Sequence, residues 1–171
     1  MKGLVGWREW VGLPDLGIRY LKAKIDTGAK TCSLHAMHIK IVEQDGMRYA
    51  RFHTSPVQGR SHALVLCQAP LVDVRDVTNS GGQTETRYVI HTHMRFRDHS
   101  FDCEMTLTER GDMAFQMLVG RNALRSRFIV DSGGSFLQGK PPQIIPVPKS
   151  ARKPAKPKTV RKTVPKQADI D

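Results

Sequence analysis

The residues of this chain whose types and spacing best suit chemistry are Asp26, Thr27 and Gly28. They follow segment 20–25, where apolar and polar residues alternate as in a half-buried strand. The pattern predicts a carboxylate at the end of a strand, on a tight glycine turn, with a hydroxyl group beside it. Glycine lets backbone and ligand come close, and a rigidly held carboxylate can act as a general acid or base. Because three residues form a weak motif, other segments must support this interpretation.

A second segment, residues 113–124, predicts a buried strand, a glycine and a short helix in succession. Its apolar residues end at Val119, Gly120 follows, and Arg121 begins the expected helix 121–125. This is the only convincing helix that the sequence indicates.

In this order, the two segments resemble the retropepsin-like aspartic proteases. In that family two apolar residues and a glycine, often followed by Arg-Asn, pack against an Asp-Thr-Gly loop. Segments 6–14, 23–31 and 34–36 are similar to one bacterial branch, often named ATP-dependent zinc proteases, which includes the RimB proteins. The resemblance covers about residues 4–137.

The resemblance implies an all-β fold, a retropepsin-like acid-protease closed barrel with one short C-terminal helix. It also implies that Asp26, Thr27 and Gly28 are catalytic and that Gly120 and Arg121 support their loop structurally. In such proteins the threonine hydroxyl bonds across to an opposite loop and fixes the carboxylate.

Short segments of strand-like pattern, separated by glycine and proline turns, independently indicate an all-β domain and suggest a small barrel. Asp45-Gly46 predicts a two-residue hairpin turn. The sequence Asn-Ser-Gly-Gly at 79–82 predicts another turn. The expected strands are 3–10, 19–25, 37–43, 47–54, 63–70, 71–77, 86–97, 100–107, 116–119 and 127–130.

The turn at 79–82 lies between the two motifs, where retropepsin-like proteins keep a mobile flap. A glycine-rich tip can bend over a bound peptide and exclude water, although an ordinary exposed hairpin has the same pattern. Many retropepsins have two acidic residues after the catalytic loop, whereas this chain has Lys30 and Thr31, which favours an acidic peptide. For each nearby arginine the alternative is a solvated surface charge. The predicted substrate-binding residues are Ala29, Lys30, Arg60, Arg75, Ser80, Gly81 and Arg87.

One carboxylate is too few for peptide hydrolysis by aspartates, which needs one group as base and one as acid. The chain supplies one Asp-Thr-Gly in the expected context and is too short for two lobes. We therefore expect a two-fold homodimer with Asp26 from each subunit at the axis. Asp131, in Asp-Ser-Gly after the expected segment 127–130, is a second possibility that would permit a monomer. We expect Asp131 to be a turn residue.

Composition separates a basic Lys/Pro-rich tail, 139–171, from the rest of the chain, 1–138, which the resemblance implies is a retropepsin-like protease domain. The net charge is +11, and the tail holds nine Lys and Arg against two Asp. Such a segment cannot bury enough surface to offset its ordering entropy, so we expect it to be disordered. Its function is either a weak contact with RNA, the ribosome or an acidic protein, or solubility alone.

No cofactor and no metal site are expected. The sequence has no His-Glu-x-x-His and no phosphate-binding loop of the Gly-x-x-x-x-Gly-Lys type, although His91 and His93 would share one strand face. No apolar stretch is long enough for a membrane helix, and the first residues lack the apolar centre of a signal peptide. Three scattered cysteines fit reduced thiols, and we expect a cytoplasmic protein that does not contact membranes.

Two functions are weighed. The first is an aspartic peptidase acting on acidic tails, since RimB proteins are associated with ligases that add glutamates to a small-subunit ribosomal protein. The second is a non-catalytic protease-like scaffold that binds RNA or an acidic protein through its basic surface and tail. A metalloprotease is a third possibility, which a chelator would test.

Overall fold

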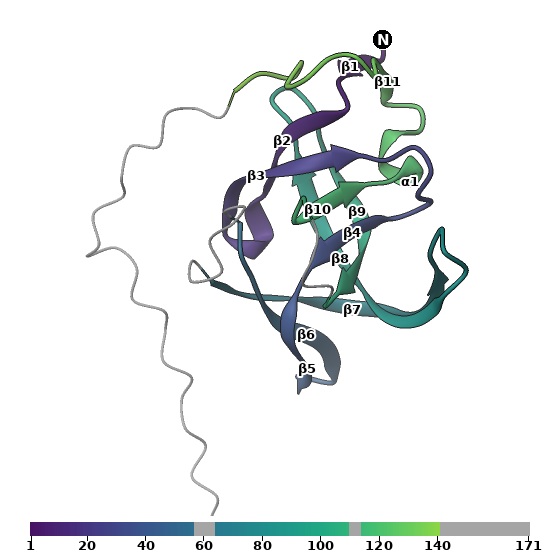
Figure 1. Cartoon of the computed structure of the whole chain (residues 1–171). Helices are drawn as coiled ribbons and strands as arrows, with labels where there is room; N and C mark the ends of the chain where they lie inside the picture. The colour runs from purple at the N-terminus through teal and green to yellow at the C-terminus, as the bar shows by residue number, and fades with distance from the viewer. Residues whose placement is uncertain (57–63, 110–113, 141–171) are drawn as a thin grey trace, which may run out of the picture. The chain divides into compact units, whose positions relative to one another are not determined.

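Eleven β-strands, one 3-10 helix and one α-helix form within residues 1–56, 64–109 and 114–140, the part of the chain that the computed structural model describes (Figure 1). The strands are β1 (Gly3–Val5), β2 (Arg8–Leu13), β3 (Ile18–Ile25), β4 (Cys32–His35), β5 (Met37–Gln44), β6 (Met47–Thr54), β7 (Val65–Thr78), β8 (Thr84–Arg95), β9 (Ser100–Thr108), β10 (Met117–Val119) and β11 (Phe128–Val130). The helices are η1 (Pro14–Leu16) and α1 (Arg121–Leu124). The expectations of a mostly β chain and one short α-helix near residue 121 are thus confirmed.

Two sheets contain these strands. β1 and β11 form a parallel pair, and the other nine strands follow the order β2-β3-β10-β4-β9-β8-β7-β6-β5. One further antiparallel pair, Gly12 with Arg95, joins β2 to β8. Pairings therefore run from β2 through five other strands and back to β2, with β7, β6 and β5 continuing beyond this ring. Because a single residue pair makes the join, the closed barrel stays a prediction.

The core consists of the inward-facing residues of these strands. On β3, the buried positions Ile18, Leu21, Ala23 and Ile25 are separated by more exposed ones. This is the alternation that predicted the strand. The core continues through β4, β8 and β10 as one cluster of buried side chains. No helix in the described ranges is long and apolar enough to cross a membrane.

Three neighbouring strands position the Asp-Thr-Gly segment. β10 lies between β3, which is parallel to it, and β4, which is antiparallel. Ile25 at the end of β3 is opposite Val119 at the end of β10. The chain after β3 and the chain after β10 therefore emerge at the same edge, side by side (Figure 1).

The expected strand 3–10 is wrong in one respect, because it is two strands. The chain changes partner between them: β1 pairs with β11, and β2 pairs with β3. Gly6 stands at the change, where an added Cβ would lie 2.1 Å from the carbonyl oxygen of Gly134. A close backbone contact of this kind leaves no periodic signal in the sequence.

The separate strands 63–70 and 71–77 are also wrong, because they belong to the single strand β7. Its first half pairs with β6 and its second half with β8. Pro70 lies where the partner changes, a position that tolerates the missing N–H group. The strand β4 was not predicted, since all four of its residues are buried and show no alternation.

Both predicted hairpin turns are present. Asp45 and Gly46 connect β5 to β6 with positive φ values of 51° and 76°, as a two-residue hairpin turn requires. At the other turn, the Asn79 side-chain oxygen accepts the N–H groups of Gly81 and Gln83 at 2.9 and 3.0 Å. The β7–β8 hairpin thus ends in a tip held by its own asparagine.

Candidate active site

The Asp26 loop is a tight turn fixed by backbone hydrogen bonds. The Asp26 N–H donates to the carbonyl oxygen of Val119 at 2.9 Å, which ties the loop to β10. One oxygen of the Asp26 carboxylate accepts the Gly28 N–H at 3.0 Å, and the Asp26 carbonyl accepts the N–H of Ala29 at 3.3 Å. The carboxylate has a fixed orientation and stays partly exposed at the end of β3.

The segment after β10 supports this loop from one side. The Arg121 N–H donates to the Ala29 carbonyl at 2.8 Å, and its guanidinium donates to the Thr27 carbonyl at 2.9 Å. Gly120 lies so close to Thr31 that an added Cβ would be 2.5 Å from the Thr31 carbonyl oxygen. Both residues therefore contact the loop where the sequence expects them, and only glycine fits at position 120 without a shift of backbone.

Asp26 opens into a cleft of about 640 Å³ between its loop and the β7–β8 hairpin. The hairpin contributes residues from Arg75 to Ser80 and also Arg87, and the support segment contributes Arg121. The Asp26 carboxylate, the β7–β8 hairpin and several cations therefore meet around this cleft. The full lining is Asp26, Gly28, Ala29, Lys30, Thr31, Ser33, Arg75, Asp76, Val77, Thr78, Asn79, Ser80, Arg87, Leu118 and Arg121.

Five of the seven predicted substrate-binding residues line this cleft. Ala29, Lys30, Arg75, Ser80 and Arg87 are among the lining residues. The lining does not include Gly81, at the hairpin tip, or Thr27, whose carbonyl faces Arg121. Arg60 lies outside the described residues.

The cations of the cleft differ in how far their charge is already compensated. Arg75 contacts Asp73 at 2.9 Å and Glu104 at 3.0 Å, and its hydrogen bond holds the pKa of Asp73 below its ordinary value. Arg87 contacts Glu85 at 2.9 Å. Lys30 forms no ion pair within the part of the chain that the structure describes. Lys30 is therefore the more available cation for an incoming anion.

Sequence reasoning missed several side chains around the cleft. Ser33 and Leu118 come from β4 and β10, whose outward faces gave no separate signal, and Asp76 adds a second carboxylate from β7. The Asp76 carboxylate accepts the hydroxyl of Thr86 at 2.8 Å. The run Arg75-Asp76 within a hairpin next to the expected flap was the signal that could have identified it.

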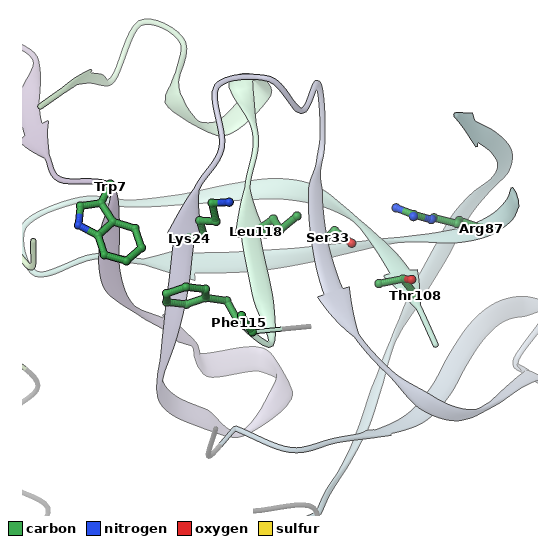
Figure 2. Close-up of a pocket in the computed structure, with 8 residues that line it drawn as sticks. Trp7, Lys24, Ser33, Arg87, Thr108, Phe115 and Leu118 are labelled. Carbon is green, nitrogen blue, oxygen red and sulfur yellow. The ribbon is translucent and has the colours of Figure 1, made fainter. Parts of the chain in front are cut away.

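A second hollow of about 320 Å³ adjoins the first and shares Ser33, Arg87 and Leu118 with it. Figure 2 shows its side chains in a row across β3, β10 and β4, with Trp7 and Phe115 at one end and Arg87 at the other. Its remaining lining residues are Lys24, Thr108 and Ala114. None of the residues peculiar to this hollow was predicted as a site residue.

Asp131 is a turn residue, as predicted. One oxygen of its carboxylate accepts the Gly133 N–H at 3.0 Å, and its carbonyl accepts the Gly134 N–H at 3.1 Å. This is the same local geometry as in the Asp26 loop, but Asp131 does not line the cleft. The turn geometry alone therefore does not distinguish the two aspartates.

Cys32, directly after the Asp26 loop, is buried against the support segment. A hydrogen bond from the Cys103 thiol and another from the Gly120 N–H lower the pKa of Cys32, with burial opposing them. The three cysteines are free thiols. Within the described ranges no three His, Cys, Asp or Glu side chains lie together as metal ligands, and His93 instead contacts Asp102 at 2.8 Å.

The chain is similar in sequence to part of several longer proteins. The chain is 41% identical over 130 residues to a probable alpha-L-glutamate ligase of Desulfotalea psychrophila (strain LSv54 / DSM 12343), covering 76% of this chain and 28% of that protein. It is 34% identical over 139 residues to one of Shewanella halifaxensis (strain HAW-EB4), covering 81% and 30%. The chain thus spans less than a third of the length of these relatives.

A solved structure has a similar fold. The protein Lpg0085, of unknown function, from Legionella pneumophila subsp. pneumophila str. Philadelphia 1 superposes with a TM-score of 0.69 and 27% sequence identity. The match covers 81% of this chain and 99% of that one. Residues 4–141 match the RimB-like family, described as retropepsin-like aspartic endopeptidase RimB, and the chain belongs to that family.

Proposed function

We propose that the protein is an aspartic peptidase that hydrolyses acidic peptide tails, with Asp26 as its catalytic carboxylate. The observation that carries the proposal is the cleft in which Asp26 faces the β7–β8 hairpin. In it a partly exposed carboxylate, rigidly held by its loop, has room for a peptide beside it. Family membership supports the same reaction, since the family is described as an aspartic endopeptidase.

The reaction needs a second carboxylate, and a two-fold dimer would supply it. One Asp26 would accept a proton from water while its partner's Asp26 donates one to the substrate carbonyl or the leaving amine. Two carboxylates in contact share a proton, because both cannot stay ionised. In this arrangement Gly28 and Ala29 would lie against the substrate backbone, and the Thr27 hydroxyl would bond across the axis.

The ring of strand pairings favours the closed barrel of such enzymes. The pair Gly12 with Arg95 would be the point at which β2 and β8 close the sheet. The β7–β8 hairpin, with residues 76–80 on the cleft, would be the flap that covers a bound peptide.

Charge around the cleft favours an acidic substrate. Of the four cations that line it, Arg75 and Arg87 already have acidic partners, so Lys30 and Arg121 are the ones that would attract an extended acidic peptide. The relatives named alpha-L-glutamate ligases support the same class, because a peptidase joined to such a ligase would meet glutamate-extended chains. A glutamylated small-subunit ribosomal protein in the cytoplasm is the substrate we infer.

The test is incubation with a peptide ending in several glutamates and with its unmodified counterpart, read by mass spectrometry. Wild type should cleave the glutamylated peptide, and Asp26→Asn should lower the rate by about 10²–10⁴-fold or more without unfolding the chain. Asp131→Asn is the matched control, because Asp131 has the same turn geometry and lies away from the cleft.

Three outcomes would count against the proposal. Cleavage that survives Asp26→Asn would remove Asp26 from the reaction, and cleavage that EDTA abolishes would favour a metalloprotease. If no peptide is cleaved but acidic peptides still bind Asp26→Asn, the chain is the non-catalytic scaffold described above.

A further inference from the structure

The hollow beside the cleft combines an apolar wall with two cations, Lys24 and Arg87. Its apolar part consists of Trp7, Phe115 and Leu118. The Trp7 and Phe115 rings meet edge to face at 5.8 Å, and the Arg8 guanidinium lies 4.7 Å from the Trp7 ring centre. Trp7 is therefore held in place before any ligand arrives, which lowers the entropy that binding must overcome.

Two cations line this hollow, and only one of them has a charge partner. Arg87 is paired with Glu85, and its side chain is only 10% exposed. Lys24 is exposed and forms no ion pair with any carboxylate in the described ranges. Its neighbour on the same strand, Lys22, has its ammonium 5.2 Å from the Trp10 ring centre instead.

The position of Lys24 ties this hollow to the catalytic loop. Lys24 stands two residues before Asp26, and in the sheet it is opposite Leu118, which lines both hollows. Figure 2 shows Lys24 in the row between Trp7 and Leu118. A peptide in the cleft that continues across β4 and β10 toward β3 would therefore present its next side chains to Trp7, Phe115 and Lys24.

We propose that this hollow is a substrate subsite for a side chain with an apolar stem and a terminal carboxylate, such as glutamate, and that Lys24 determines its specificity. The inference rests on the proposed function in taking an acidic peptide as the ligand. The methylene groups of the stem would pack on the aromatic pair and Leu118. The carboxylate would pair with the ammonium of Lys24, which lines the hollow and is exposed.

The effect of Lys24 should be modest in size and specific to one peptide position. Exposed ion pairs contribute up to about 1 kcal/mol, so replacing one glutamate by glutamine should weaken binding roughly fivefold at low salt. The preference should shrink as salt is added, because the pair is reached by solvent.

The experiment measures binding of a labelled hexaglutamate and its six single Glu→Gln variants to the inactive Asp26→Asn chain, by fluorescence anisotropy. At one of the six positions, the peptide with glutamate should bind more tightly than the peptide with glutamine, because the glutamate carboxylate pairs with Lys24. Adding Lys24→Met should abolish the preference there and leave the other positions unchanged, Lys24→Arg should keep it, and Lys24→Glu should reverse it. Lys40→Met, on β5 outside both hollows, is the charge-matched control.

The inference is overturned if Lys24→Met binds all seven peptides as its parent does, or weakens every one equally, as a general charge effect would. It is also overturned if norleucine replaces glutamate at that position with no loss, since the hollow would then be purely apolar. Because the experiment measures binding, its outcome is independent of the proposed function. If the active chain cleaves no peptide but the preference still depends on Lys24, the proposed peptidase activity is contradicted and the proposed subsite is supported.

Discussion

At the scale of residues, Asp26 and Asp131 occupy turns of the same local geometry. Each carboxylate accepts the N–H of the glycine two residues later at 3.0 Å. The sequence motifs Asp-Thr-Gly and Asp-Ser-Gly therefore predicted both turns correctly. The difference between them lies in their neighbours, since only Asp26 meets Arg121 and the β7–β8 hairpin at a cleft.

The charged residues, too, differ in their neighbours in the folded chain, which the sequence motifs do not show. Arg75 and Arg87 were predicted to bind substrate, and both line the cleft, but both are also paired with acidic neighbours on or beside their own strands. Lys24 entered the sequence analysis only as one residue of the alternating segment 20–25. The strand register decides which cation has no carboxylate partner. A sequence pattern does not give that register.

Arg121 offers a test of positioning at this scale. Arg121→Met removes the hydrogen bond from its guanidinium to the Thr27 carbonyl, so the Asp26 loop should become looser. We expect kcat to fall by about tenfold, with a smaller change in KM and a loss of roughly 1 kcal/mol in unfolding free energy.

Arg121→Lys is the conservative variant and should recover part of kcat, because an ammonium can also donate to the carbonyl. Steady-state kinetics and urea unfolding measure both quantities. A Met variant with unchanged kcat would mean that the loop needs no support from Arg121.

At the scale of elements, the site depends on β10 lying between β3 and β4. The alternation in β3 and the apolar run before Gly120 made two of these strands predictable. β4 was not, because four consecutive buried residues have no period. Its place between β10 and β9 is what brings Ser33 to the cleft.

Gly120 tests how closely these elements must approach. Gly120→Ala would put a methyl group 2.5 Å from the Thr31 carbonyl oxygen, so the Asp26 loop or α1 must shift. We expect a loss of about 1–3 kcal/mol in unfolding free energy, as for other overpacked sites, together with loss of cleavage. Urea unfolding and the peptide assay measure the two effects.

Gly133→Ala is the control in the similar turn after β11. There the nearest atom to an added Cβ is the Asp131 carboxylate oxygen at 3.5 Å, which is ordinary contact. This variant should stay within about 0.5 kcal/mol of the parent. If Gly120→Ala is equally mild, the close packing at Gly120 does not hold the site together.

At the scale of the whole molecule, charge is distributed unevenly along the chain. Nine Lys and Arg fall in residues 139–171, where the sequence predicted a separate tail, while the family match ends at residue 141. We expect a chain ending at residue 140 to keep its cleavage rate and to lose most of its affinity for RNA.

Filter binding at two salt concentrations measures that affinity, which should fall steeply with salt in the full chain. Equal RNA binding by the shortened chain would assign the contact to the folded part. Loss of cleavage without loss of folding would instead make the tail part of substrate recognition.

Assembly is the other property at this scale, because a single chain brings one Asp-Thr-Gly to its cleft. The most direct measurement mixes wild type with Asp26→Asn in varied ratio at constant total concentration, allows subunits to exchange, and follows cleavage of the glutamylated peptide. If each site needs Asp26 from both subunits, activity follows the square of the wild-type fraction, so an equal mixture retains about one quarter of the activity. A linear dependence, with about one half retained, would contradict the paired-aspartate account, because each chain would then work with its own carboxylate.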